Sequence, residues 1–166
     1  RADVAKLRLE EEGAKTLLVG AHDTRTLYKG KHGYPAASTT KIDELGGAEA
    51  IDALVIPGGF APDYMRRNCA MLQLVADCFA ADKPVAAICH GPWMLCSARD
   101  DKLRPVVEGR KATAFVAIKD DVVNAGAQWV DAPVVVDGPL ITSRTPADLT
   151  PFCQAIIDEV ARRRAA

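Results

Sequence analysis

The stretch KPVAAICHGPWML, residues 83–95, combines the pattern of a buried strand with that of a sharp turn. Residues 84–89 are apolar throughout, which is typical of a short strand covered on both faces. A Cys-His pair and then Gly-Pro follow at once, and Pro is tolerated in the first turn of a helix. We therefore expect a strand, a turn at Cys89 and a helix. The thiol is then either buried at the strand end or exposed on the turn as a nucleophile.

Short apolar strands and amphipathic helices alternate on both sides of this stretch. Further strands are expected in residues 14–21, 53–56 and 112–115 and on either side of the Asp-Gly-Pro turn at 137–139, with a hairpin excursion over 26–39. Helices are expected in residues 1–13 (Val4 and Leu7 sharing a face, Gly13 as C-cap), 61–68, 70–82, 91–98, 117–126 and 146–164, and a surface loop in 99–111. This alternation predicts an α/β sandwich with a mostly parallel sheet, formed by residues 1–166 as a single domain.

The composition of the 166 residues is ordinary for a globular protein, with 49% hydrophobic and 26% charged residues. The formal net charge is -1, so there is no basic excess to neutralise phosphates and nucleic acid is not an expected partner. No apolar run approaches the length of a membrane span, and no membrane partner is expected. A leader sequence is not expected either.

The five cysteines show no CxxC spacing, and only three histidines are available to join them. Cys78 and Cys96 fall in apolar helical patterns, where a cysteine commonly behaves as a small hydrophobic residue. We therefore expect reduced thiols, no metal site, no cofactor and a cytoplasmic location.

Two loops, each directly after an expected strand, carry the residues from which an active site could be built. Ala87-Ile88-Cys89-His90-Gly91 has the small-x-nucleophile-x-Gly form of a nucleophile elbow, where the strained backbone leaves no room for neighbouring side chains. The N-terminus of a following helix would favour the thiolate, which is the reactive species. Gly58-Gly59 ends the preceding strand, and glycines there let backbone N–H groups approach a developing negative charge. Ligands bind at this edge of parallel sheets.

Several segments together resemble one known family: DALVIPGGFAPDYMR, VAAICHGPWML, GRKATAF, IKDDVVNAGAQWVD, VVVDGPLITSRTPADL and YKGKHGYP. They are similar, in the same order and over nearly all of residues 1–163, to the PfpI-type branch of the ThiJ/PfpI superfamily. The resemblance implies a flavodoxin-like, class I glutamine amidotransferase-like sandwich that forms dimers or larger homo-oligomers. It also implies a cysteine enzyme: a deglycase, a cofactor-independent glyoxalase or an intracellular peptidase.

The resemblance also assigns roles to particular residues of this chain. Cys89 matches the nucleophile and His90 the adjacent catalytic histidine. Asp63 falls where the branch has an acidic residue that completes the triad from a neighbouring subunit. Gly59 and the backbone N–H of His90 match the oxyanion hole, and we include Gly58 and Gly91 among the oxyanion or substrate-binding residues.

The chain departs from the family pattern at two places. The family has a first strand followed by a glutamate that bonds to the nucleophilic sulfur, and both would lie before Arg1. We therefore expect the natural protein to extend further upstream, since a missing central strand would leave backbone groups of its neighbours unpaired. Phe115 stands where relatives often have a tyrosine, so a hydrogen bond from that hydroxyl is lost.

These residues support two classes of function. In the first, the Cys89 thiolate attacks a small carbonyl compound such as methylglyoxal, or a glycated amine, and His90 moves the protons. In the second, Cys89 is an oxidisable thiol in a non-catalytic redox-sensing stress protein or chaperone. A glutaminase is excluded because residues 142–149 hold neither His nor Glu, and an esterase because no His follows His90.

Overall fold

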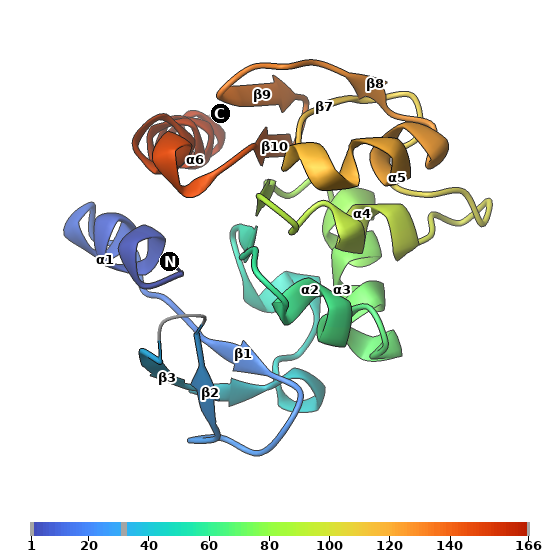
Figure 1. The fold of residues 1–166 in the computed structure, drawn as a ribbon. Coiled ribbons are helices and arrows are strands. Elements are labelled where there is room, and N and C mark those ends of the chain that lie inside the picture. Colours follow the sequence, from blue (N-terminus) through green and yellow to red (C-terminus); the bar gives the residue numbers. More distant parts are fainter. Residues whose placement is uncertain (1, 31–32, 166) are drawn as a thin grey trace.

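The computed structural model describes residues 2–30 and 33–165 (Figure 1). Its central feature is a four-stranded sheet in the order β5 (Leu54–Ile56), β6 (Val85–Ile88), β10 (Leu140–Ser143) and β9 (Val134–Asp137). The first three strands are parallel, and β9 returns antiparallel to β10 through a turn at Gly138, whose φ is 59°. The expected α/β sandwich with a mostly parallel sheet is confirmed.

Alternation along β6 explains why helices cover both faces of this sheet. Ala86 and Ile88 belong to one buried apolar cluster, whereas Val85 and Ala87 belong to the other. Side chains of successive strand residues point to opposite faces, so a strand that is apolar throughout must be covered twice. All four residues of β6 are buried accordingly. The residues that run into the nucleophile loop are thus the centre of the core.

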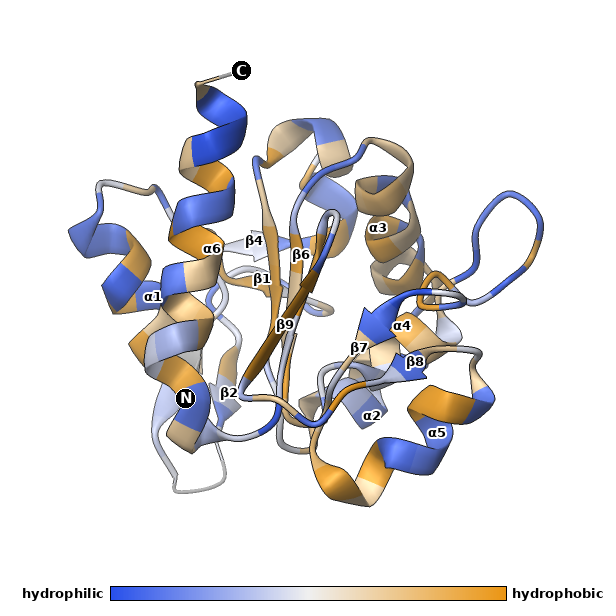
Figure 2. Cartoon of the chain, turned by 90° about the horizontal axis from the view of Figure 1, so that it is seen from above, coloured by the Kyte–Doolittle hydropathy of each residue, from blue (hydrophilic) through white to orange (hydrophobic). Residues whose placement is uncertain are grey.

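Two helices cover one face, and the remaining helices cover the other (Figure 2). α1 (Ala2–Glu11) and α6 (Leu149–Arg164) pack on the first face through Ala5, Phe152 and Ile156. α3 (Cys69–Ala80), α4 (Trp93–Ser97) and α5 (Lys119–Asn124) cover the second face, and the short α2 (Ala61–Met65) lies beside α4. No helix in the described part of the chain is long and apolar enough to cross a membrane.

Three small sheets lie outside the central one. Their strands are β1 (Val19–Gly20) parallel to β4 (Thr40–Lys41), β2 (Leu27–Lys29) antiparallel to β3 (Pro35–Ala37), and β7 (Lys111–Ala112) parallel to β8 (Gln128–Trp129). Single 3₁₀ turns are formed by Ile42–Glu44, Ala48–Ala50, Val116–Ile118 and Pro146–Asp148. The pairing of β2 with β3 confirms the expected hairpin excursion, although residues 31–32 at its tip lie outside the described residues, as does Arg1.

Some local predictions are wrong. Of the strand expected in residues 14–21, only Val19–Gly20 forms, because a single short strand, β4, is there to pair with it. In α1, Val4 and Leu7 are 49% and 59% exposed, and the small Ala5 faces α6 instead. The strand expected over 112–115 ends at Ala112. The loop 99–111 lies only partly on the surface, since Val106 and Val107 are buried in the core.

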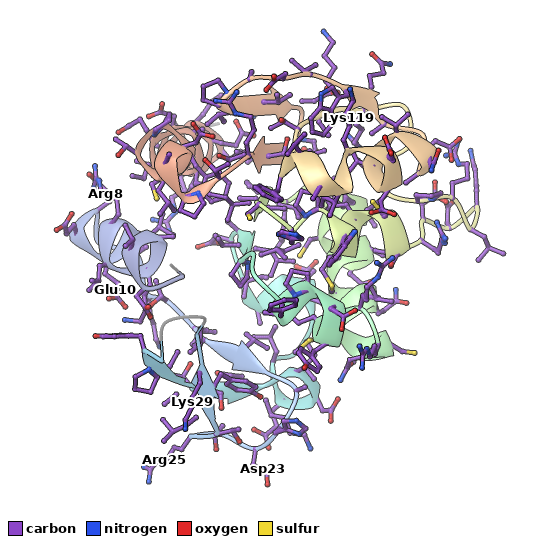
Figure 3. The ribbon with its side chains drawn as sticks, viewed as in Figure 1. Arg8, Glu10, Asp23, Arg25, Lys29 and Lys119 are labelled. Carbon is purple, nitrogen blue, oxygen red and sulfur yellow. The ribbon has the colours of Figure 1, made fainter. Side chains whose placement is uncertain are left out.

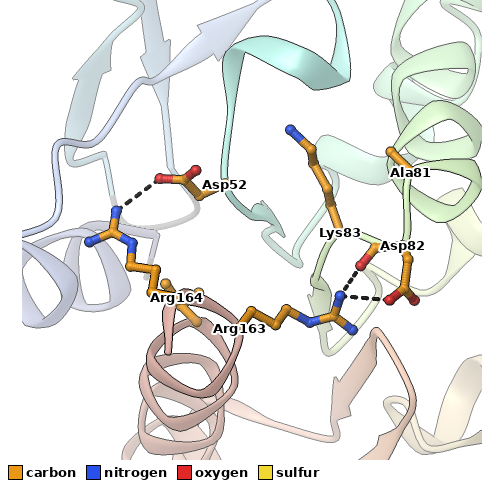
Figure 4. Close-up of a pocket in the computed structure, with 7 residues that line it drawn as sticks. Asp52, Ala81, Asp82, Lys83, Arg163 and Arg164 are labelled. Atoms are coloured by element: carbon orange, nitrogen blue, oxygen red, sulfur yellow. Dashed lines mark hydrogen bonds and ion pairs between the residues drawn. The ribbon is translucent and has the colours of Figure 1, made fainter. Parts of the chain in front are cut away.

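Ion pairs join the C-terminal helix to the loops that precede β5 and β6 (Figure 4). Arg163 donates hydrogen bonds to the carboxylate and the backbone oxygen of Asp82, and Arg164 lies 2.9 Å from the carboxylate of Asp52. These side chains surround a cavity of about 230 Å³. The cavity lies at the end of the sheet away from Cys89. We therefore expect the ion pairs around it to contribute to the stability of the fold and not to catalysis.

The surface around α1 and the hairpin carries charges of both signs. Arg8 on α1 and Asp23, Arg25 and Lys29 near the hairpin lie on this side of the molecule (Figure 3), and Glu10 on α1 pairs with Lys6. Acidic and basic side chains are mixed here, consistent with the near-zero net charge of the chain.

Candidate active site

Cys89 occupies a strained turn directly after β6. Its φ is 61°, in the left-handed region that costs a non-glycine residue about 1–2 kcal/mol. Two hydrogen bonds hold it there: its N–H donates to the Ser143 carbonyl at 2.9 Å, and its own carbonyl accepts from the Phe115 N–H at 2.9 Å. The residue is half-buried, so the thiol is neither in the core nor fully in solvent. The strain and the partial exposure match those of a nucleophile elbow.

The other cysteines lie in environments that make most of them poor nucleophiles. Burial raises the pKa of Cys78 and of Cys96 to about 11, and it also raises the pKa of Cys153. Cys69 is exposed at the start of α3, away from any histidine of the described chain. Among the described residues, Cys89 is the one cysteine whose sulfur lies within hydrogen-bond distance of a histidine ring nitrogen.

His90 lies next to the thiol and between two aromatic rings. Its Nδ1 is 3.3 Å from Cys89 Sγ, close enough to exchange a proton with it. The ring stacks on Phe115 with centroids 5.0 Å apart and meets the edge of Trp93 at 5.1 Å. Burial lowers the pKa of His90, which favours the neutral form of its imidazole. A neutral imidazole can accept the thiol proton and return it later.

Two of the glycines next to Cys89 leave no room for a side chain, and a third has a left-handed backbone. A Cβ on Gly58 would lie 2.6 Å from Cys89 Cβ, and one on Gly91 would lie 2.8 Å from the Ile56 carbonyl oxygen. Gly59 has φ 74°. Within the described chain, the N–H groups of Gly58, Gly59 and His90 donate to no acceptor, whereas that of Gly91 donates to the Ile88 carbonyl. Free amides next to the thiol are what an oxyanion requires, and Gly91 supplies space instead.

Asp63 does not reach Cys89 or His90 of the same chain. It lies on α2, where its half-exposed carboxylate pairs with Arg67. Its assignment to a neighbouring subunit's site therefore stays a prediction. Sequence reasoning missed the position of Trp93 beside His90. The signal was present, since residues three apart at a helix start lie on one side of it.

Phe115 lines one side of a cavity of about 370 Å³. Lys119, whose position near the top of the molecule is shown in Figure 3, lines it together with Trp129 and Arg144. Arg144 is held at 2.8 Å from the carboxylate of Asp131 and 3.2 Å from that of Asp148. Among the described residues, no group of His, Cys, Asp and Glu could hold a metal ion.

Comparison with known proteins identifies the family. The DJ-1/PfpI family model matches residues 4–159, nearly the whole chain. The chain belongs to this family, and the resemblance inferred from its motifs is confirmed.

Individual relatives agree with this assignment. A deglycase of Pyrococcus horikoshii is 46% identical over 142 residues, covering 86% of this chain and 80% of that protein. Protein/nucleic acid deglycase 2 of Escherichia coli is 48% identical over 126 residues, covering 75% of this chain and 69% of that one. Among solved structures, a two-domain protein of Anabaena variabilis with DJ-1/ThiJ/PfpI-like and ferritin-like domains has a TM-score of 0.87 at 39% identity, covering 95% of this chain and 43% of that one.

Proposed function

We propose that this protein is a PfpI-type deglycase that removes dicarbonyl adducts from amines by nucleophilic catalysis at Cys89. The observation that carries the proposal is the elbow itself: a half-buried thiol at φ 61°, 3.3 Å from the His90 imidazole and beside free amides. Relatives at 46% and 48% identity that are named deglycases support the same reaction class. True proteolysis fits less well, since a half-buried sulfur admits small adducts more readily than a folded protein.

The geometry suggests a sequence of balanced steps for an amine bearing methylglyoxal. Cys89 Sγ bonds to the carbinol carbon as the carbon–nitrogen bond breaks, and His90 carries the thiol proton to the departing amine. The product is a hemithioacetal on the enzyme. His90 then moves a proton from that carbon to the neighbouring one, while the hydroxyl proton passes to the ketone oxygen. These two transfers convert the hemithioacetal into a lactoyl thioester. Water hydrolyses the thioester, so that adduct plus water gives amine plus lactate.

The amides beside the sulfur stabilise negative charge in these steps. An oxyanion develops on the substrate oxygen during the proton shift and again during hydrolysis. The N–H groups of Gly59 and His90 are free to donate to it. Removal of one preorganised donor of this kind lowers the rate about 10²- to 10³-fold.

The test is release of amine and lactate from methylglyoxal-modified N-acetyl-lysine. We expect turnover by the wild type and by Cys69→Ser, which removes an exposed thiol elsewhere, and none by Cys89→Ser. If His90→Gln loses turnover while its Cys89 still reacts with an alkylating reagent, His90 is identified as the residue that transfers the protons. A wild type that oxidises at Cys89 but releases no lactate contradicts the deglycase and supports the redox-sensing alternative.

We further propose that the active site is completed in a homo-oligomer by Asp63 of a neighbouring subunit. Phe60 and Tyr64, on either side of Asp63, are 77% and 67% exposed. Exposed aromatic residues support an interface here, because aromatic residues are enriched at protein interfaces. Mixing Cys89→Ser with Asp63→Asn subunits should restore activity that neither has alone, because one mixed site then holds both native residues. A monomer in solution, or no recovery on mixing, contradicts the shared site.

The state of the cysteines supports a cytoplasmic location, which we also propose. All five are free thiols, and disulfides are rare in reducing compartments. Cell fractionation with an antibody against the protein tests this.

A further inference from the structure

The ring of His90 is held by packing in its own subunit. Phe115 lies against it at an interplanar angle of 29°, and Trp93 presents an edge at 66°. In the described part of the chain, the one side-chain hydrogen-bond partner of His90 is Cys89, and no carboxylate contacts the imidazole. Since a carboxylate usually fixes the orientation of a catalytic histidine, these two rings occupy the place of that support within the chain.

Trp93 comes close to His90 because of the turn between them. The Trp93 N–H donates to the His90 carbonyl at 3.1 Å, closing a single helical turn. This spacing puts both side chains on one side of the helix start. Trp93 is half-buried against the core, so its indole has few alternative positions.

The indole is fixed in turn by α5. Trp93 Nε1–H donates to the carboxylate of Asp121 at 2.9 Å, and a hydrogen bond to a charged acceptor is directional. On α2's side, the Arg66 guanidinium lies 5.7 Å from the indole centroid, and its Nε donates to Ser97 Oγ at 2.9 Å. The indole therefore has defined partners on two sides besides the imidazole.

We propose that Trp93 is a positioning residue that fixes the plane of His90 against Cys89, and that Asp121 acts through it. The inference rests on the proposed function only in taking His90 as the proton carrier. The rings set the imidazole within each subunit before a neighbour's acid approaches it. Displacement of a catalytic group by about 1 Å can cost 10²-fold in rate.

The charged and titratable groups around this arrangement are few. In the described part of the chain they are Cys89 beside the imidazole, Arg66 from the end of α2, Asp121 from α5, and Cys96, whose Sγ lies 3.7 Å from the backbone oxygen of Asp121. Two rings shield the imidazole from water, so removal of one ring should change its hydration directly.

The experiment compares Trp93→Ala, Trp93→Phe and Asp121→Leu in the full chain. Three quantities are measured: lactate release, the rate of Cys89 alkylation by iodoacetamide, and the His90 titration by NMR, assigned with His90→Gln. We expect Trp93→Ala to lower kcat about 10- to 100-fold with KM nearly unchanged and to raise the His90 midpoint. Trp93→Phe and Asp121→Leu should each lower kcat roughly threefold. Their double variant should be no worse than either alone, because both remove the same bond.

A matched control lies next to Asp121 in the sequence. Asp120→Leu changes the neighbouring carboxylate on the same helix and should behave as wild type. If Trp93→Ala fails to fold, the two milder variants carry the test. The proposal is overturned if the variants keep kcat within about twofold of wild type and the His90 titration midpoint within about 0.2 pH units of it. A wild type without deglycase turnover leaves the alkylation and titration results to decide it.

Discussion

Gly58→Ala should damage the site through steric overlap alone. Gly58 does not have a positive φ, so alanine meets no backbone strain of its own. Its Cβ would lie 2.6 Å from Cys89 Cβ and 2.8 Å from the Ile88 carbonyl oxygen, distances that folded proteins do not tolerate. Since one neighbour is backbone and the other is attached to it, relief requires moving the elbow. Overpacking of this kind costs about 2 kcal/mol, which lowers Tm by roughly 4–8 °C in a chain of this size.

The loss of activity should exceed the loss of stability. An elbow displaced by a few tenths of an ångström to 1 Å moves the sulfur relative to His90 and the free amides, which predicts about a 100-fold fall in kcat. Urea unfolding measures the stability, and lactate release measures the activity of the folded fraction. Gly30→Ala is the control, because its Cβ would meet nothing closer than the Tyr34 carbonyl oxygen at 3.4 Å. A Gly58→Ala protein with kcat and Cys89 alkylation within twofold of wild type would refute the reasoning.

Further outcomes follow from burial and hydrogen bonding. Cys89 should be alkylated fastest of the five thiols, as read by mass spectrometry after limited iodoacetamide; equal labelling would contradict the elbow. The NMR titration midpoint of His90 should lie below the ordinary 6.5, because burial disfavours its charged form. Hydrogen bonds from Arg162 first, then other Arg contacts, lower the pKa of Glu159 from 4.5 to about 2. That stability, about 1 kcal/mol after screening of the exposed Arg162 by solvent, is present above pH 4.5 and is lost as the pH falls toward 2, so Glu159→Gln should flatten the acid limb of urea unfolding. Thr113→Val should raise the free energy of unfolding by about 1 kcal/mol, since its buried hydroxyl has no partner among the described residues; a loss of stability would show that the hydroxyl is used.

The sequence predicts the interior of this fold better than its margins. The apolar run through Val85–Ile88 has one physical solution, a strand covered on both faces, and the small residues around Cys89 allow the turn that follows. Residues 14–18 end in the apolar pair Leu17-Leu18 but fail to form a strand, because strand formation depends on a partner that local sequence does not specify. The same dependence shortens β7, where the chain leaves the ladder to bond Cys89.

The candidate site shows the same division. Cys89, His90 and the glycines could be predicted because their requirements are local: a left-handed φ, adjacent residues and absent side chains. The stacking of Phe115 on His90 could not, since the two residues are far apart in the sequence and meet through the sheet. The position of Trp93 beside His90 could be predicted, because residues three apart at a helix start lie on one side of it. Asp63 was reached by resemblance alone, and in a single subunit it pairs with Arg67.

Phe115 links the two halves of the catalytic arrangement. Its backbone N–H holds the Cys89 carbonyl at 2.9 Å, and its side chain lies against the His90 ring at 5.0 Å. The strained nucleophile and its base therefore both contact one residue, which follows β7 in the chain and is not part of the elbow. The opposite hydrogen bond of Cys89, to Ser143, comes from β10, whose residues are all buried. Because the Ser143 support belongs to the buried β10, the left-handed turn cannot relax to an ordinary conformation without breaking a hydrogen bond to the core. The energy stored at Cys89 is thus maintained by the stability of the whole domain, which is why a reactive geometry can persist in a short loop.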